Sequence, residues 1–399
     1  MKISPFRTQC YTPTNVVALV TACLVATVWL ASPCAAQNNY IQHNLVSDIP
    51  GLANHTDPNL ANPWGIASSA TSPFWVSDNH TGVSTLYNST GNPLALVVTI
   101  PPAPGSPPGT LGSPTGVVFN STADFQIGAS AARFIFATED GTIAGWNAGA
   151  GTSAVTEATT ADGVYKGIAL GNNGISNFLY AANFHSGAID VFNNTFAPTT
   201  LAGSFTDPNL PAGYAPFNIQ NINGSLLVTY ALQDADKEDD VPGAGHGFVD
   251  RFDLNGNLLQ RLITDGVLNS PWGLAIGPSA FGAFSNDLLV GNFGDGRINA
   301  FDPANGTFLG TLEDPNGNPI TIEGLWGLRV GNGGNGGDPN TLYFAAGIPG
   351  GGEIEDHGLF GSITVPESGA TFSFMALGLV ALAGCGRALR IVRLQISGR

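Results

Sequence analysis

The sequence predicts an all-β fold, a six-bladed β-propeller built from four-stranded blades. Gly (53) and Pro (27) are frequent and charged residues make up only 11% of the 399 positions, so turns are many and charged helical faces are few. A turn that leads into a buried strand occurs six times. Its copies end at Gly65, Gly116, Gly167, Asn218, Gly273 and Gly327, at spacings of 51, 51, 51, 55 and 54 residues. Four-stranded units that repeat at about 50 residues are typical of propeller blades.

Each copy of this blade-start turn, of which Ser270-Pro-Trp-Gly273 is the clearest, leads into further strands. A second, apolar strand begins at Phe74, Phe134, Phe178, Leu226, Leu288 and Leu342. A third strand begins at a glycine, namely Gly82, Gly141, Gly187, Gly247, Gly296 and Gly358. A fourth strand is expected in most copies, at Leu94–Ile100, Leu201–Phe205, Leu258–Ile263 and Phe308–Leu312. Because the recurring tryptophans Trp64, Trp272 and Trp326 belong to the repeat, we expect them to pack within the blades rather than contact a ligand.

The ring is predicted to close through the N-terminal part of the body. The sixth copy ends without a fourth strand, and the segment Tyr40–Val46 has the alternating character of the missing one. Pairing of this segment with the last blade would remove the open sheet edge and join the two ends of the domain. The propeller is therefore expected to span residues 37–364.

The first 36 residues have the features of a secretory signal peptide. Lys2 and Arg7 precede an apolar run from Val16 to Leu30, and small residues surround an expected cleavage point after Ala36. A membrane anchor is the alternative, although fifteen apolar residues are short for a span of roughly 20. Export of the protein, with removal of this segment by signal peptidase, is expected.

Residues 365–399 resemble the three-part PEP-CTERM sorting signal of exosortase systems. The motif Val365, Pro366, Glu367, Ser368 and Gly369 is followed by an apolar segment and a basic tail. The resemblance implies transient membrane anchoring, cleavage by an exosortase-like protease near Pro366 and Glu367, and delivery to the bacterial cell surface or the medium. A retained C-terminal membrane anchor is the alternative.

Cysteines and basic residues are concentrated in the two end segments. All four cysteines lie there, so no disulfide is expected in the exported body. The ends also hold six of the 13 Lys and Arg residues and one acid, Glu367, which leaves a body with 7 basic and 28 acidic residues and a net charge of about −21. This charge argues against nucleic acid or an anionic membrane surface as a partner of the body.

The body resembles a family of secreted, exosortase-associated β-propeller proteins without an assigned activity. The resemblance extends over nearly all of Asn38–Thr364 and is carried by the segments Gln233–Asp250, Pro271–Ala275, Gly291–Asp302, Gly324–Leu328 and His357–Gly361. It implies the propeller fold and the export route, and it implies no reaction.

In a propeller the loops between the second and third strands of all blades gather at one mouth of the central channel. Here these loops are rich in Asp, Glu, Asn and His. Oxygen ligands of this kind suit a hard cation such as Ca²⁺, and the candidate ligands are Glu139, Asn183, Asp234, Asp236, Asn292 and Asp295. The alternative is local, because Asp and Asn before Gly stabilise tight turns on their own.

Two kinds of function are consistent with this mouth. The first is a surface propeller without catalytic activity, which binds a cation, an extracellular glycan or a matrix component. The second is a metal-dependent lactonase or lyase in which Glu139, Asn183, Asn292 and Asp295 hold the metal and His185 or His246 acts as base. No familiar enzyme motif of the hydrolase, zinc-protease or nucleotide-binding type occurs, which favours the first.

Overall fold

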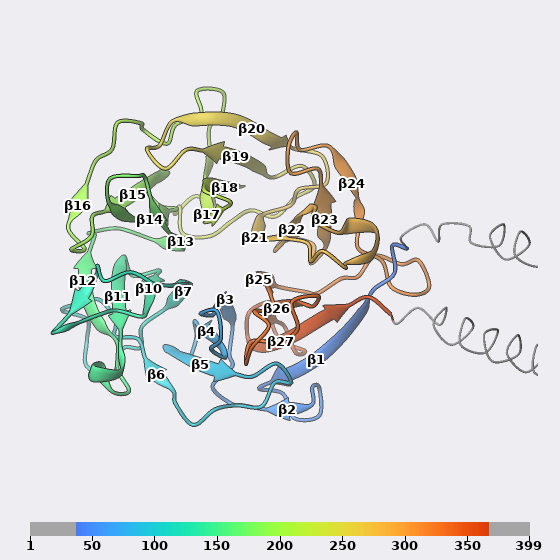
Figure 1. The fold of residues 1–399 in the computed structure, drawn as a ribbon, viewed down its shortest axis with the longest axis horizontal. Helices are drawn as coiled ribbons and strands as arrows, with labels where there is room; N and C mark the ends of the chain where they lie inside the picture. The colour runs from blue at the N-terminus through green and yellow to red at the C-terminus, as the bar shows by residue number, and fades with distance from the viewer. Residues whose placement is uncertain (1–36, 367–399) are drawn as a thin grey trace, which may run out of the picture. The chain divides into compact units, whose positions relative to one another are not determined.

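A computed structural model describes residues 37–366, which form a closed ring of six β-sheet blades (Figure 1). The predicted signal peptide and the sorting signal from Glu367 onward lie outside the described residues. Between residues 37 and 366, no helix is long and apolar enough to cross a membrane. The all-β, six-bladed propeller predicted from the spacing of the turns is confirmed.

Blades 1 to 3 follow each other along the chain, and each has its first strand at the channel. Blade 1 contains β3 (Pro63–Ala67), β4 (Phe74–Asp78), β5 (Val83–Tyr87) and β6 (Val98–Thr99). Blade 2 contains β7 (Pro114–Phe119), β10 (Phe134–Thr138), β11 (Thr142–Trp146) and β12 (Val155–Thr159). Blade 3 contains β13 (Tyr165–Asn172), β14 (Asn177–Asn183), β15 (Ala188–Phe192) and β16 (Pro198–Thr199).

Blades 4 to 6 complete the ring. Blade 4 contains β17 (Tyr214–Ile222), β18 (Ser225–Leu232), β19 (Phe248–Phe252) and β20 (Leu258–Thr264). Blade 5 contains β21 (Pro271–Ile276), β22 (Leu288–Asn292), β23 (Ile298–Phe301) and β24 (Phe308–Thr311). Blade 6 contains β25 (Leu325–Val330), β26 (Leu342–Ile348), β27 (His357–Thr364) and the N-terminal strand β1 (Ile41–Ser47).

Strand β1 closes the ring as its sequence predicts. It pairs antiparallel with β27 from Ile41 opposite Thr364 to Ser47 opposite Leu359, and the two strands lie side by side in Figure 1. A short strand β2 (His55–Thr56) then adds in parallel to the outer edge of β1. Blade 6 is therefore built from strands at both ends of the domain. The N-terminal strand supplies the fourth strand that this blade would otherwise lack.

The glycine of the blade-start turn recurs because neighbouring inner strands approach each other closely. A Cβ atom on Gly65 of blade 1 would lie 2.6 Å from the carbonyl oxygen of Thr115 in blade 2. A Cβ atom on Gly273 of blade 5 would lie 2.7 Å from the carbonyl oxygen of Trp326 in blade 6. Only a residue without a side chain fits this distance without a shift of the backbone. The period found in the sequence thus records the contact between one blade and the next.

The hydrophobic core of residues 37–366 is divided among the blade interfaces. Six of its seven buried apolar clusters lie between neighbouring sheets, such as the one that joins Trp75 of blade 1 to Phe134 of blade 2 with ring centroids 4.1 Å apart. The seventh cluster lies in the central channel. Burial of apolar side chains on both faces of the sheets is therefore the main source of stability in the described residues.

Two segments differ from the expected strand pattern. Blade 2 carries an additional hairpin, β8 (Gln126–Ile127) and β9 (Ser130–Ala131), between its first two strands. The fourth strand expected at Leu201–Phe205 is wrong, because that role falls to β16. The segment instead packs on blade 4, where the amides of Gly203 and Phe205 donate to the carbonyl oxygens of Asn255 and Gly256. Phe205 then inserts beside Tyr180 and Phe252.

Candidate functional site

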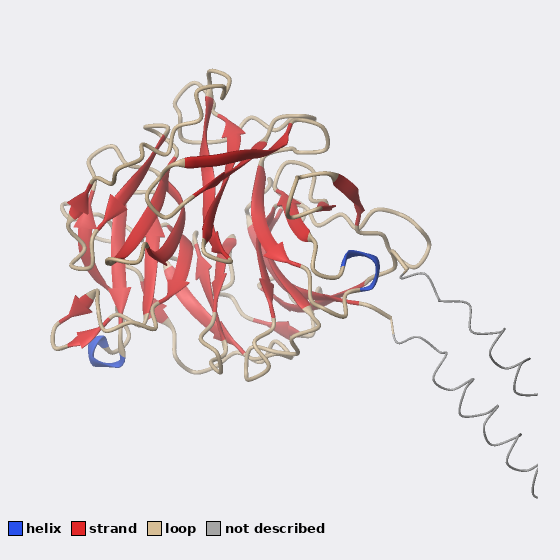
Figure 2. Ribbon diagram, turned by 45° about the horizontal axis from the view of Figure 1, so that its top comes forward, coloured by secondary structure: helices blue, strands red, loops and turns tan. Residues whose placement is uncertain are grey.

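The turns that start the blades and the turns between second and third strands lie at one end of the propeller, since consecutive antiparallel strands reverse direction. Figure 2 shows the loops gathered at the two ends of the strands. The residue just before the end of each blade-start turn occupies an equivalent place near the channel. These six channel-ring residues are Trp64, Thr115, Lys166, Phe217, Trp272 and Trp326. Four of them are aromatic, and one is a lysine.

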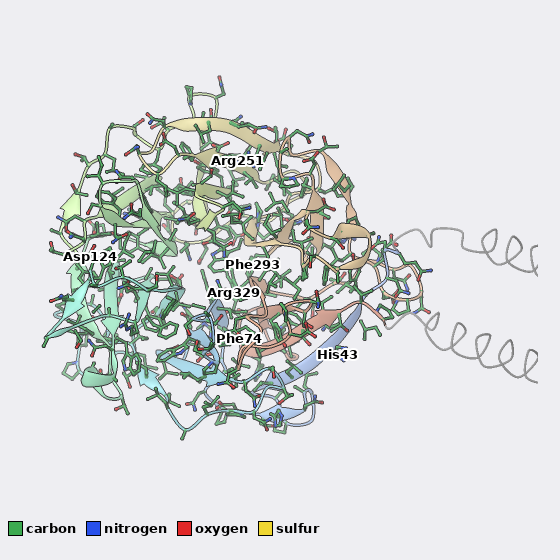
Figure 3. The ribbon with its side chains drawn as sticks, viewed as in Figure 1. His43, Phe74, Asp124, Arg251, Phe293 and Arg329 are labelled. Carbon is green, nitrogen blue, oxygen red and sulfur yellow. The ribbon has the colours of Figure 1, made fainter. Side chains whose placement is uncertain are left out.

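The aromatic members of the ring fill the channel. Trp326 stacks on Trp64 with ring centroids 3.5 Å apart and on Phe293 with centroids 4.1 Å apart, while Trp272 meets Trp326 edge-on at 5.7 Å. Phe293 lies near the centre of the ring in Figure 3. We call this cluster the aromatic plug. The tryptophans do pack, as expected, but they pack across the channel rather than within single blades.

Lys166 lies beside the plug and is 2% exposed. Its ammonium group is 5.1 Å from the centroid of the Trp64 ring, 2.5 Å from Glu139 Oε1 and 3.3 Å from Asp239 Oδ1. Burial alone would lower the pKa of Lys166, but the nearby carboxylates of Glu139 and Asp239 outweigh it and raise the pKa. Lys166 is therefore a fixed positive charge at the base of the mouth.

Glu139 is held in its charged form by the same contacts. It sits in the turn between β10 and β11, and its Oε2 accepts a 2.8 Å hydrogen bond from the Asn79 side chain of blade 1. Burial would raise the pKa of Glu139, yet the Lys166 ammonium group holds it below its ordinary value. Glu139, which is half-buried, and the buried Lys166 thus form an ion pair between blades 2 and 3.

Two carboxyl groups near this ion pair have pKa values that are raised rather than lowered. Glu355, in the loop between β26 and β27, accepts a 2.9 Å hydrogen bond from the Asn62 side chain, and burial raises its pKa to about 7. Burial likewise raises the pKa of Asp240 to about 6. Near neutral pH Glu355 and Glu139 therefore differ in charge, although they line the same mouth.

These side chains line an open cavity of about 430 Å³, which we call the acidic cup. Its wall is polar, with Val164 as its one aliphatic residue among the described ones. Five carboxylates line it, namely Glu139, Asp140, Glu238, Asp239 and Glu355, together with Asn62, Asn79, His80 and Ser113. Such a wall can bind a cation or the hydroxyl groups of a polar ligand.

Of the six predicted cation ligands, the structure places one, Glu139, in the acidic cup. Asn292 and Asp295 lie together, since the Asn292 amide donates to Asp295 Oδ1 at 3.0 Å. Asn183 instead donates to Asp190 at 2.9 Å and accepts from the backbone of its own turn.

Asp234 and Asp236 belong to the long loop between β18 and β19, where Asp234 accepts a 3.0 Å hydrogen bond from the Glu238 amide. Among residues 37–366 no group of three or more His, Cys, Asp or Glu side chains is arranged to hold a metal ion. Calcium at the mouth stays a prediction.

The two histidines named as a candidate base lie outside the lining of the acidic cup. His246 contacts the Val241 carbonyl oxygen through Nδ1 at 2.9 Å, and the His185 carbonyl oxygen lies 3.4 Å from the Gln233 amide nitrogen. Reasoning from the sequence did not single out Lys166 or Glu355. For Lys166 a signal was present, because a charged residue stands where the other blades carry Trp, Phe or Thr.

The fold and the cup define a class of protein, a six-bladed β-propeller with a plugged channel and an acidic mouth. No family model matches the chain. Uncharacterized protein R648 of Acanthamoeba polyphaga mimivirus is 33% identical over 335 residues, which cover 80% of this chain and 78% of the relative. Uncharacterized protein L690 of the same virus is 34% identical over 336 residues, or 80% and 84% of the two chains. The chain belongs to the family of these two proteins.

Similar solved structures bear on the fold alone. A glucose dehydrogenase superposes with a TM-score of 0.50 at 13% identity and covers 81% of this chain and 98% of its own. A streptogramin B lyase covers 82% of this chain and 99% of its own, with a TM-score of 0.49 at 14% identity.

Proposed function

We propose that the protein is a binding propeller without catalytic activity, whose acidic cup holds a cationic ligand. The charge balance of the cup carries this proposal. Five carboxylates line it, and one buried ammonium group, that of Lys166, contacts two of them. After the Glu139–Lys166 pair is set aside, three carboxylates face the cavity together with Glu355, whose pKa of about 7 leaves it partly protonated near neutral pH. A bound cation would relieve their mutual repulsion in a site that is partly shielded from water.

Asp239 and Glu355 are the groups that we expect to contact the ligand. The Asp239 side chain is 77% exposed, so it can turn from Lys166 to a ligand in the cup at little cost. Glu355 is half-buried and uses Oε1 to accept from Asn62, which leaves its other oxygen for a ligand. Glu139 is committed to Lys166 and Asn79, so we assign it the role of fixing the base of the cup.

The same proposal includes export and surface sorting. It is supported by the basic and apolar pattern before Ala36, by the motif that begins at Val365, and by the net charge of about −21 on the intervening body. At the surface, an extracellular glycan or matrix component is the proposed partner, reached through the cation in the cup. A mature chain that begins at Gln37 and ends near Glu367, measured by mass spectrometry of the secreted protein, is expected; a chain of full mass would contradict this part.

Isothermal titration calorimetry tests the cup. Ca²⁺ and the diamine cadaverine serve as separate probes of a metal ion and an organic ammonium group. At least one of them is expected to bind at one site per chain, and D239N and E355Q should each weaken binding about tenfold, the effect of one charged contact. D314N removes a charge from a turn of blade 5 that does not line the cup, and it should leave binding unchanged. Absence of binding by both probes would overturn the proposal.

A second candidate is acid–base catalysis in the cup, and one observation favours it. Glu355 has a raised pKa of about 7 and Glu139 a lowered pKa, which is the pairing of a proton donor with a proton acceptor. Lactone opening and β-elimination are reactions that need such a pair. Turnover of a lactone or elimination substrate that is lost in E355Q and kept in D314N would support this candidate; loss of cation binding alone in E355Q would not.

A further inference from the structure

Below the aromatic plug the channel continues as a second, separate cavity. Its volume is about 240 Å³, and residues from all six inner strands line it, with Trp272 of the plug at its closed end. A wider cavity of about 530 Å³ shares Arg329, Gln220, Asn221, Ser68, Leu274 and Leu328 with it. The wider cavity reaches the ends of the inner strands, opposite the blade-start turns. Together the two cavities form a blind tunnel that opens on the face away from the acidic cup.

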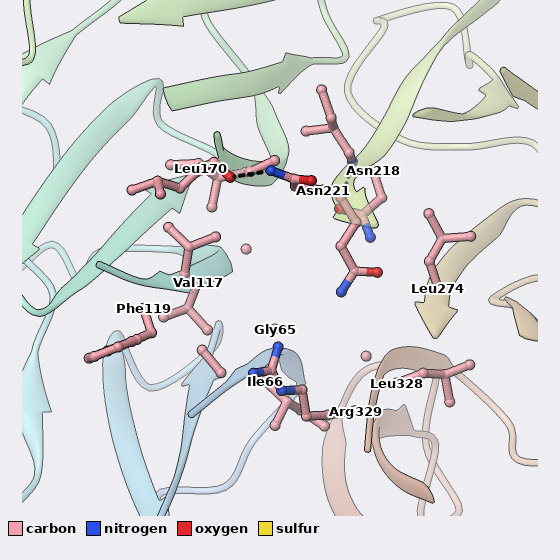
Figure 4. Close-up of a pocket in the computed structure, with 18 of the residues that line it drawn as sticks. Gly65, Ile66, Val117, Phe119, Leu170, Asn218, Asn221, Leu274, Leu328 and Arg329 are labelled. Atoms are coloured by element: carbon pink, nitrogen blue, oxygen red, sulfur yellow. Dashed lines mark hydrogen bonds between the residues drawn. The ribbon is translucent and has the colours of Figure 1, made fainter. Parts of the chain in front are cut away.

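The lining of this tunnel is positively charged, whereas the rest of the body is strongly negative. Arg329 lines both cavities, and neither of them has an Asp or Glu in its lining. Within residues 37–366 no carboxylate lies within ion-pair distance of Arg329, whose guanidinium group donates to the Ser68 carbonyl oxygen at 3.2 Å. Figure 4 shows this guanidinium group directed into the channel. A half-buried cation with no counter-charge is costly unless a ligand or water compensates it.

The position of Arg329 in the repeat indicates that the fold does not need an arginine there. Arg329 is the third residue after the channel-ring residue of blade 6. The equivalent residues of blades 1 to 5 are Ala67, Val118, Ala169, Gln220 and Ala275. Four blades are thus built with a small aliphatic residue at this place. The two polar exceptions, Gln220 and Arg329, line the same tunnel.

Gln220 supplies a second polar group without a partner. Its side-chain oxygen is buried and accepts no hydrogen bond from the described residues. By contrast, the neighbouring Asn221 amide donates to the Leu170 carbonyl oxygen at 3.0 Å, which is the dashed line in Figure 4. The tunnel therefore offers one fixed cation, one free acceptor, and aliphatic wall residues such as Ile66 and Leu328.

We propose that this tunnel binds a small organic hydroxy-carboxylate. Its carboxylate would pair with the Arg329 guanidinium group, whose planar donors match a carboxylate in a bidentate way. Its hydroxyl group would donate to the Gln220 oxygen, and its short apolar part would contact the aliphatic wall below Trp272. The narrow cavity of about 240 Å³ has room for a molecule of a few carbon atoms.

Titration calorimetry on the full chain tests this site with sodium 2-hydroxybutyrate, butyrate and phosphate at constant ionic strength. The expected order of affinity is hydroxybutyrate, then butyrate, then phosphate, with one site per chain. R329Q should weaken the binding of both carboxylates at least about tenfold. R329K should give an intermediate loss of affinity, because it keeps the charge without the bidentate geometry. Q220L should weaken the binding of hydroxybutyrate several-fold and leave the affinity for butyrate unchanged.

R133Q, which alters an arginine of blade 2 that is not among the residues lining the tunnel, is the matched control and should bind as the wild type does. Circular dichroism and the melting temperature establish that each variant is folded. Wild-type affinity in folded R329Q, equal loss in R133Q, or binding of phosphate as tightly as hydroxybutyrate would overturn the proposal.

Discussion

Lys166 of blade 3 and Glu139 of blade 2 form a 2.5 Å ion pair at the base of the acidic cup. The pair joins neighbouring blades at the one level of the channel where the other ring residues are mainly aromatic. Because Glu139 also lines the acidic cup, a substitution in this pair is expected to change both the stability of the protein and the charge of the cup.

Replacement of Lys166 by Met is expected to destabilise the protein by about 2–4 kcal/mol, because it leaves the Glu139 carboxylate without its counter-charge. The double variant K166M/E139Q should recover most of this loss, since neither charge is then left alone. Urea unfolding of the two single variants and the double variant measures the coupling. Additive effects of the two substitutions would show that the pair is not coupled.

The aromatic plug is expected to be a major source of stability. W326A removes a buried side chain that stacks on both Trp64 and Phe293 and should cost about 3–5 kcal/mol of unfolding free energy. It should also connect the acidic cup to the tunnel, so that acrylamide quenches the remaining tryptophans more strongly. W326F retains an aromatic ring and should lose less than half as much; equal losses in the two variants would show that stacking is unimportant.

Because β1 closes the ring, the protein is expected to be sensitive to substitutions of the buried residues of this strand. Val46 is fully buried in β1 beside Tyr343 and Phe360 of blade 6. V46D would place a carboxylate in this cluster, and we expect it to detach β1, expose the edge of β27 and promote association between chains. Light scattering and unfolding experiments measure both effects. I41T, at a position that is 36% exposed on the same strand, is the control and should remain monodisperse.

Stability is expected to fall as the pH rises from about 5 to 8. The pKa values of Glu355 and Asp240 are raised to about 7 and about 6 in the folded protein, so the folded state binds these protons more tightly than the unfolded state does. Their contribution is complete below the unfolded values of roughly 4 and is lost as the pH rises through the folded values. The lowered pKa of Glu139 acts in the opposite direction, but below pH 4.5, outside this window.

The pH prediction is checked by urea unfolding at several pH values. E355Q should reduce the slope between pH 6 and 8, and part of the slope should remain because burial also raises the pKa of Asp250 to about 7. D314N should retain the full slope. A slope that is unchanged in E355Q would assign the pH dependence to other groups.

The repeat made most of the fold predictable, and the physical reason is visible at Gly65 and Gly273. Each glycine is required by the approach of the next blade, so the spacing between glycines measures the length of a blade. Weak outer strands were less predictable, because segments such as Leu201–Phe205 are placed by contacts with a neighbouring blade rather than by their own pattern.

The site was predictable only as a region. The turns between second and third strands do lie at one end of the propeller, since the order of strands determines which turns share an end. Loops of this kind from four of the six blades line the acidic cup. Which side chains face the cavity depends on the conformation of each turn. Asn183 bonds within its own blade, whereas Glu355 lies in the equivalent loop of blade 6 and reaches Asn62 of blade 1.

A crystal structure of the protein with the cation that binds most tightly tests the central claim most directly. The proposal predicts the cation in the acidic cup, in contact with the Asp239 and Glu355 carboxylates and above the Lys166–Glu139 pair, with metal–oxygen distances of about 2.3–2.6 Å if the cation is Ca²⁺. An empty cup, or a cation bound instead at Asp234 and Asp236 or at Asp295, would contradict it.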